Sequence, residues 1–307
     1  MIVAKIITIP EDAVGQRIDN FLITALKGVP RSRIYRGLRK GEFRVNGGRI
    51  SADYRLCLND QIRIPPIRVS ESAQSDKAPS RLLSLLESRI LYEDEALLAI
   101  NKPSGIPVHG GTNVSWGLIE LLRELKPQPR PLELIHRLDR ETSGCLLIAK
   151  KRKALLEWHE LLTKRQVNKR YLLLVEGCWD PQKKKVELPL KKNVLQSGER
   201  IVRVDSEGKS AITHFKILKI FTNATLLSAE LVTGRTHQIR VHAAASGCPV
   251  AGDKKYGDNK LKINRLFLHC EHMGRRCKTD SGFQSVSAEL DIDLKKILES
   301  LKPKNCS

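Results

Sequence analysis

The stretch LIHRLDRETSGCLLIAK, residues 134–150, joins a highly charged segment to an apolar run. Within it Asp139 stands between Arg137 and Arg140, just ahead of residues 145–149, which read as a buried strand. Positive neighbours favour the ionised form of a carboxylate, and an ionised carboxylate suits a nucleophile better than a proton donor. The local sequence therefore allows two interpretations, a salt-bridged turn and a carboxylate kept charged for chemistry.

Short apolar runs and amphipathic segments alternate on both sides of this stretch, which is typical of an α+β domain. The expected elements are strands at 96–100, 145–150, 171–177 and 224–232, and helices at 155–164 and 235–247. We find no G-x-G-x-x-G or G-K-[ST] phosphate loop, so the sequence contains no recognisable binding motif for a nucleotide cofactor.

The composition indicates two domains and a polyanionic partner. The chain has 307 residues, is 41% hydrophobic, and carries 54 Lys and Arg against 34 Asp and Glu, a net charge of +20. The chain is therefore long and apolar enough to form more than one hydrophobic core. The excess of positive charge favours nucleic acid as a partner over a basic surface that is merely solvated.

Membrane and metal classes receive no support from the sequence. No apolar run approaches the roughly 20 residues of a membrane helix. The seven cysteines contain no C-x-x-C pair, and His237 and His242 are five residues apart, which does not place them on one helix face. We expect free thiols in a reducing cytoplasm, no metal and no membrane association.

Residues 16–68 read as a small basic module. Apolar residues at 18, 21, 22, 25 and 26 predict one helix, and Ser32 to Gly41 predicts a second. On the second helix Arg33, Arg36 and Lys40 share a face, and Arg44 lies in a strand that leads to an Asn-Gly turn. The polar segment 69–80 reads as a linker, and the second domain is expected at 89–300.

The first module resembles the S4 RNA-binding domain through RIDNFL, SRIYRGLRKGEFRVNGGRI and NDQIRIP. The second resembles the RluA family of pseudouridine synthases through six motifs in order: NKPSGIPVHGG, HRLDRETSG, KRYLLLVEG, TGRTHQIRVH, GDKKYGD and RLFLHC. The resemblance implies an S4 domain followed by the pseudouridine synthase fold, with a mixed, largely antiparallel sheet and flanking helices.

The resemblance also assigns roles to residues. Asp139 would be the catalytic carboxylate, Tyr171 would pack on the uracil, and Arg235 would pair with Asp139. Arg137 would enter the RNA stack vacated by the flipped base. Lys102 and His109, in the loop before, are candidate RNA contacts with an equally good interpretation as turn residues. In the S4 domain the RNA-binding candidates are Arg33, Arg36, Lys40 and Arg44.

The implied reaction breaks the C1′–N1 bond of uridine and rejoins the base through C5, without a cofactor. The residues leave open whether the carboxylate attacks the ribose or assists a glycal route. The implied partner is 23S ribosomal RNA or a large-subunit assembly intermediate, acted on by a monomer in the bacterial cytoplasm. Other RNAs such as tRNA, a non-catalytic assembly factor, and a base-removing glycosidase are the alternatives; the last would need a second carboxylate that activates water.

Overall fold

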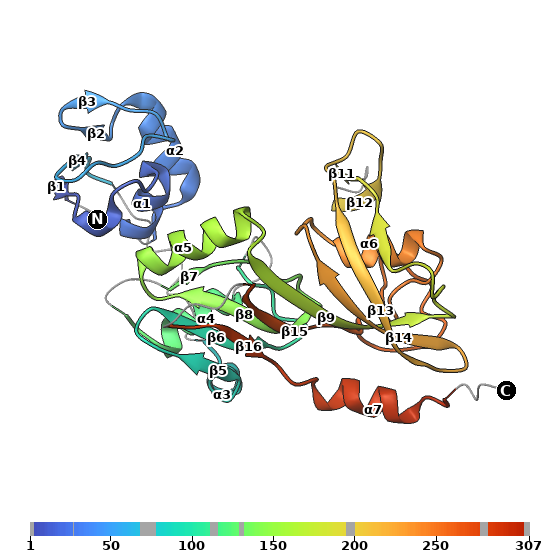
Figure 1. The fold of residues 1–307 in the computed structure, drawn as a ribbon. Helices are drawn as coiled ribbons and strands as arrows, with labels where there is room; N and C mark the ends of the chain where they lie inside the picture. The colour runs from blue at the N-terminus through green and yellow to red at the C-terminus, as the bar shows by residue number, and fades with distance from the viewer. Residues whose placement is uncertain are drawn as a thin grey trace. The chain divides into compact units, whose positions relative to one another are not determined.

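The computed structural model describes residues 3–26, 28–67, 78–110, 116–128, 132–194, 200–276 and 282–303. The chain divides into two compact units, residues 1–77 and 78–307 (Figure 1). Most of the predicted linker at 69–80 lies outside the described residues; at its end, Ser80 already begins a helix. No helix of the described segments is long and apolar enough to cross a membrane.

The first unit packs two helices on a small antiparallel sheet. Its elements are β1 (Lys5–Thr8), the 3₁₀ turn η1 (Glu11–Ala13), α1 (Ile18–Ala25), α2 (Arg31–Lys40), β2 (Arg44–Val45), β3 (Gly48–Arg49) and β4 (Gln61–Ile64). The strand order is β1-β4-β2-β3. Most of the predicted apolar positions lie in the core: Ile18, Leu22, Ile34 and Leu38 are buried in one cluster with Ile62, whereas Ala25, the last residue of α1, is exposed.

The basic face of α2 differs from its prediction at one residue. Arg36 and Lys40 are exposed, but Arg33 is half-buried and its Nη2 lies 2.6 Å from Oε2 of Glu42. Arg44 donates from Nη1 to the Gly47 carbonyl at 3.2 Å. Of the three predicted residues on α2, Arg36 and Lys40 are therefore the exposed ones, whereas Arg33 forms an ion pair within its own unit.

The second unit is built on one large mixed sheet. Its described helices are α3 (Ser80–Glu87), α4 (Leu118–Leu125), α5 (Arg152–Thr163), α6 (Gln238–Ala245) and α7 (Ile292–Ser300). Its described strands are β5 (Ile90–Glu93), β6 (Leu97–Lys102), β7 (Glu133–Leu134), β8 (Ser143–Ala149), β9 (Val167–Glu176), β10 (Lys185–Glu187), β11 (Leu190–Val194), β12 (Arg200–Val204), β13 (Ile212–Ile220), β14 (Ala224–Leu231), β15 (Leu268–Arg275) and β16 (Ser285–Ser287).

The strand order is β10-β13-β14-β9-β15-β8-β6-β5, with β16 beside β15, β7 beside β8, and β11-β12 as a separate hairpin (Figure 1). The pairing of β8 with β15 is parallel and the other pairings in the described sheet are antiparallel. The predicted α+β architecture with a mixed, largely antiparallel sheet is confirmed.

The parallel pairing of β8 with β15 at the centre of the sheet explains why residue 144 is a glycine. Gly144 has φ +109° and pairs with Cys270. A Cβ at this position would stand 2.2 Å from the Cys270 carbonyl oxygen, so the two backbones approach more closely than any side chain allows. The sequence Asp139 to Gly144 is thereby fixed as a turn that enters the middle of the sheet.

Two element boundaries differ from prediction in ways that affect the site. Strand β9 begins at Val167, four residues before the predicted start, so Tyr171 lies mid-strand. Helix α6 begins at Gln238, because His237 has φ +54° and ends the extended segment before it. Arg235 is therefore not a helical residue.

Candidate active site

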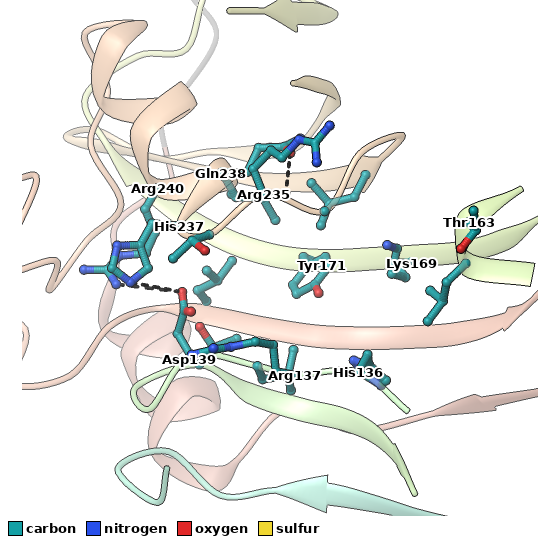
Figure 2. A pocket seen from close by; sticks show the side chains of 18 residues that line it. His136, Arg137, Asp139, Thr163, Lys169, Tyr171, Arg235, His237, Gln238 and Arg240 are labelled. Carbon is teal, nitrogen blue, oxygen red and sulfur yellow. Dashed lines mark hydrogen bonds and ion pairs between the residues drawn. The ribbon is translucent and has the colours of Figure 1, made fainter. Parts of the chain in front are cut away.

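A pocket of about 400 Å³ lies beside the central strands and is lined by residues from four of the predicted motifs. Asp139 and Arg137 come from the turn before β8, Tyr171 from β9, and Arg235 from the segment before α6 (Figure 2). This volume falls within the roughly 300–1,000 Å³ of small-ligand sites. Among the described lining residues Asp139 is the one carboxylate. The structure thus gathers the candidate catalytic residues around one cavity.

Asp139 faces Arg240 of α6 and His237, the residue before α6, and not its neighbours in sequence. Its Oδ2 lies 3.8 Å from His237 Nε2 and 3.9 Å from Arg240 Nη1. Arg137 is exposed at the pocket, while Arg140 donates from Nε to the Gly105 carbonyl at 2.9 Å. Arg140 also lies 3.6 Å from Oε1 of Glu141. Among the described residues neither flanking arginine is within ion-pair distance of Asp139, so Asp139 itself is not part of a salt-bridged turn.

The predicted pairing of Arg235 with Asp139 is wrong. Arg235 is exposed and donates from Nε to the Ser210 carbonyl at 3.1 Å, and its side chain points away from Asp139 (Figure 2). Among the described residues the guanidinium within ion-pair distance of Asp139 is that of Arg240. The reason is the start of α6: Arg240 lies on the first helical turn and faces the pocket, whereas Arg235 precedes the helix.

A second carboxylate fixes Arg240. Asp253 is buried and accepts from Arg240 Nε and Nη2, both at 2.7 Å, in the bidentate geometry that guanidinium and carboxylate favour. Asp253 also accepts from the backbone N–H groups of Lys255 at 2.9 Å and Tyr256 at 3.1 Å. These bonds hold the pKa of Asp253 below its usual range against the opposing effect of burial. Asp253 therefore stays charged and leaves Nη1 of Arg240 turned to Asp139.

Tyr171 presents a neutral phenol to the pocket. Burial raises the pKa of its hydroxyl well above the ordinary value, and the nearby Cys270 and Asp139 act in the same direction. The hydroxyl therefore keeps its proton at neutral pH, so that Tyr171 is suited to packing and hydrogen bonding. Lys169, two residues earlier on the same strand face, also lines the pocket, and burial lowers the pKa of its ammonium.

The structure corrects the prediction that Lys102 contacts RNA. Its side chain is fully buried, and Nζ donates to the carbonyls of Pro103 at 2.9 Å, Ile106 at 2.8 Å and Arg140 at 3.0 Å. Three acceptors match the three N–H bonds of an ammonium group, although burial lowers the pKa of Lys102 to about 7. Lys102 thus ties its own loop to the turn that carries Asp139. His109 is exposed on that loop and does not line the pocket.

Replacing Lys102 by methionine should destabilise the protein by about 2–4 kcal/mol, because three buried carbonyl oxygens would lose their donor. Urea unfolding followed by circular dichroism measures the change. Lys151→Met is the matched control, since Lys151 is exposed and its ion pair with Glu95 is a surface pair worth at most about 1 kcal/mol. Equal midpoints for the two variants would show that the three bonds are dispensable.

Residues 96–245 match the family described as RNA pseudouridylate synthase, and residues 16–62 match the S4 domain. Among solved structures, a human RNA pseudouridylate synthase domain containing protein 4 superposes with a TM-score of 0.59 at 26% identity, over 73% of this chain and 98% of that one. Together with the relatives described next, these matches show that the chain belongs to the RNA pseudouridylate synthases and carries an S4 domain.

Several curated relatives carry the name ribosomal large subunit pseudouridine synthase C. The protein of that name from Pasteurella multocida is 51% identical over 99% of this chain and 95% of its own length. The one from Escherichia coli is 49% identical over 97% of both chains. The similarity therefore spans both units and the whole candidate active site.

Proposed function

We propose that the protein isomerises specific uridines of the large-subunit ribosomal RNA, the 23S RNA of bacteria, to pseudouridine. The observation that carries the proposal is the pocket in which Asp139, held by Arg240 and His237, lies with Tyr171. The names of the curated relatives support the substrate, and the S4 domain and net charge of +20 support binding to RNA. The proposed setting is the bacterial cytoplasm, with the protein acting as a monomer and without a metal or cofactor.

The reaction rearranges bonds without net oxidation. The C1′–N1 bond breaks, a C1′–C5 bond forms, the proton on C5 leaves, and N1 ends with a proton. The carboxylate of Asp139 acts at the ribose carbon, either by attack or by assisting a glycal intermediate. The target base has to leave its stack. The free energy of base flipping is lowest in RNA loops and single strands, where it is a few kcal/mol at most, so we expect target uridines there.

The other pocket residues then have defined roles. The exposed guanidinium of Arg137 at the pocket edge takes the place of the flipped base, since its planar group can stack and donate hydrogen bonds. The ring of Tyr171 packs on the uracil. Arg36, Lys40 and Arg44 of the S4 domain contact the phosphate backbone.

Tritium release tests this function. RNA labelled with tritium at C5 of uridine, prepared as free 23S RNA and as large-subunit particles from cells that lack the gene, should release label to water on incubation with the protein. Mapping of pseudouridine in the product then gives the positions. A glycosidase would leave abasic sites, and an assembly factor would release nothing. Absence of release from both substrates, with tRNA active instead, would move the function to tRNA.

A further inference from the structure

The two groups that approach Asp139 converge on one of its oxygens. His237 Nε2 and Arg240 Nη1 both face Oδ2, at 3.8 and 3.9 Å. Among the described residues, no side chain or backbone group donates a hydrogen bond to Oδ1. The side chain of Asp139 is 20% exposed, and that exposure opens into the pocket that it lines. The carboxylate therefore has one oxygen that both groups face at ion-pair distance and a second oxygen that neither group faces.

Arg240 and His237 are each held in place by a further side chain on the side away from Asp139. Asp253 fixes Arg240 through the bidentate pair. His237 is fixed by Tyr256, whose hydroxyl oxygen lies 2.8 Å from Nδ1, and the Tyr256 ring also stacks under the Arg240 guanidinium at 5.0 Å. Because Asp253 also accepts from the backbone N–H of Tyr256, Arg240, Asp253, His237 and Tyr256 form one connected group around Oδ2.

Tyr256 and Asp139 lie on opposite nitrogens of His237 and together favour one tautomer. Burial, Arg240 and Lys255 lower the pKa of His237 against the opposing charges of Asp139 and Asp253, so that the ring is neutral near pH 7. Burial raises the pKa of Tyr256, so its hydroxyl keeps its proton. The phenol oxygen already accepts from the Val202 N–H at 3.0 Å. A carboxylate oxygen facing Nε2 favours the tautomer that carries its proton there, and in that tautomer the Tyr256 hydroxyl donates its proton to the lone pair of Nδ1.

We infer that His237 is a positioning residue whose Nε2–H, kept in that tautomer by Tyr256, acts with Arg240 to hold Oδ2 of Asp139 and so presents Oδ1 to the ribose of the substrate. The inference rests on the proposed function of Asp139. The opposite tautomer would turn a lone pair toward a carboxylate and repel it. With Arg240 alone, the carboxylate has one anchor and can rotate about its Cβ–Cγ bond. Loss of orientation of a reacting group by about 1 Å can cost on the order of 10²-fold in rate.

Tyr256→Phe is the variant that isolates this effect, because it removes the hydroxyl and keeps the ring stacked on Arg240. Single-turnover pseudouridine formation at saturating 23S RNA should fall about 10–100-fold, as it should for His237→Ala. RNA affinity should stay within about twofold, because neither group is placed to bind phosphate. Such a change in rate without a change in binding is not what a merely structural loss would give.

Two further variants separate positioning from damage to the fold. His237→Gln should recover most of the loss in His237→Ala, since the glutamine amide N–H can take the place of Nε2–H. The double variant Tyr256→Phe with His237→Ala should be no slower than His237→Ala, because the hydroxyl acts through the imidazole. Tyr92→Phe, which removes a hydroxyl bonded to Asp94 outside the pocket, should keep the wild-type rate.

The experiments distinguish failure of this inference from failure of the proposed function. Wild-type rate in Tyr256→Phe, additive losses in the double variant, or equal rates in His237→Gln and His237→Ala would each overturn the inference. All three can occur while the wild type stays active and Asp139→Asn stays inactive, which would leave the proposed function standing. An inactive wild type, or an active Asp139→Asn, would instead overturn the function on which the inference rests.

Discussion

Asp139→Asn should reduce pseudouridine formation by at least about 10⁴-fold, because an amide can neither attack the ribose nor stabilise charge that develops there. No second carboxylate among the described lining residues can substitute for it. RNA binding should change little or tighten, since the variant removes a negative charge from a protein whose proposed substrate is a polyanion. Single-turnover kinetics and filter binding on the same 23S RNA measure the two effects separately.

Asp258→Asn is the matched control for this variant. Asp258 is an exposed aspartate of the GDKKYGD motif, outside the pocket, and its loss should leave the rate unchanged. Both variants should unfold near the wild-type temperature, because neither aspartate is a buried, fully bonded group. Product formed by Asp139→Asn at more than about a hundredth of the wild-type rate would exclude the carboxylate as the reacting group.

The sequence predicts correctly those helices and strands that have one apolar, buried face and one polar, solvated face. The apolar spacing of α1 and α2 is resolved correctly because one side of each helix is buried and the other is solvated. The start of β9 is obscured because residues 168–170 are polar. Arg170 faces outward there and pairs with Glu271 of β15 at 2.9 Å, a contact between residues 101 positions apart. Such cross-strand pairs carry no local signal.

The resemblance brings Asp139 and Tyr171 to one pocket, but it does not identify the partner of Asp139. The assignment of Arg235 rests on the motif TGRTHQIRVH, which contains a second arginine at 240. The left-handed backbone at His237 starts α6 three residues later than predicted and brings that second arginine to Asp139. A positive φ at a histidine has no sequence signature comparable to that of glycine. The role of Asp253 is equally hidden, because its position after a glycine reads as a turn until its distance to Arg240 is known.

The burial of Lys102 could not be predicted from the sequence either. A lysine before Pro-Ser-Gly reads as an exposed turn residue, and lysines are almost never fully buried unless they are paired. Here the partners are three carbonyls, of which the Arg140 carbonyl is 38 residues away. Backbone acceptors are present at every position, so the sequence cannot indicate which of them will surround an ammonium group.

Arg240→Lys should lower the rate of pseudouridine formation by about 10²–10³-fold, while Arg235→Lys should lower it by less than about threefold. A lysine keeps the charge at position 240 but cannot bind Asp253 with two nitrogens and still face Asp139 with a third. At position 235 the guanidinium is exposed and bonded to the Ser210 carbonyl, so the chemistry does not depend on it. The pair of variants compares the arginine that the structure places at Asp139 with the one that the sequence predicted.

A loss in Arg240→Lys could also arise from unfolding, because breaking a buried ion pair costs about 3–5 kcal/mol when one charge stays behind. Arg240→Met combined with Asp253→Asn removes both charges and keeps an oxygen for the backbone N–H groups of Lys255 and Tyr256. This double variant should regain most of the stability in urea unfolding and remain as slow as Arg240→Lys. Recovery of the rate together with the stability would mean that Arg240 only supports the fold, and a larger loss in Arg235→Lys than in Arg240→Lys would restore Arg235 as the partner of Asp139.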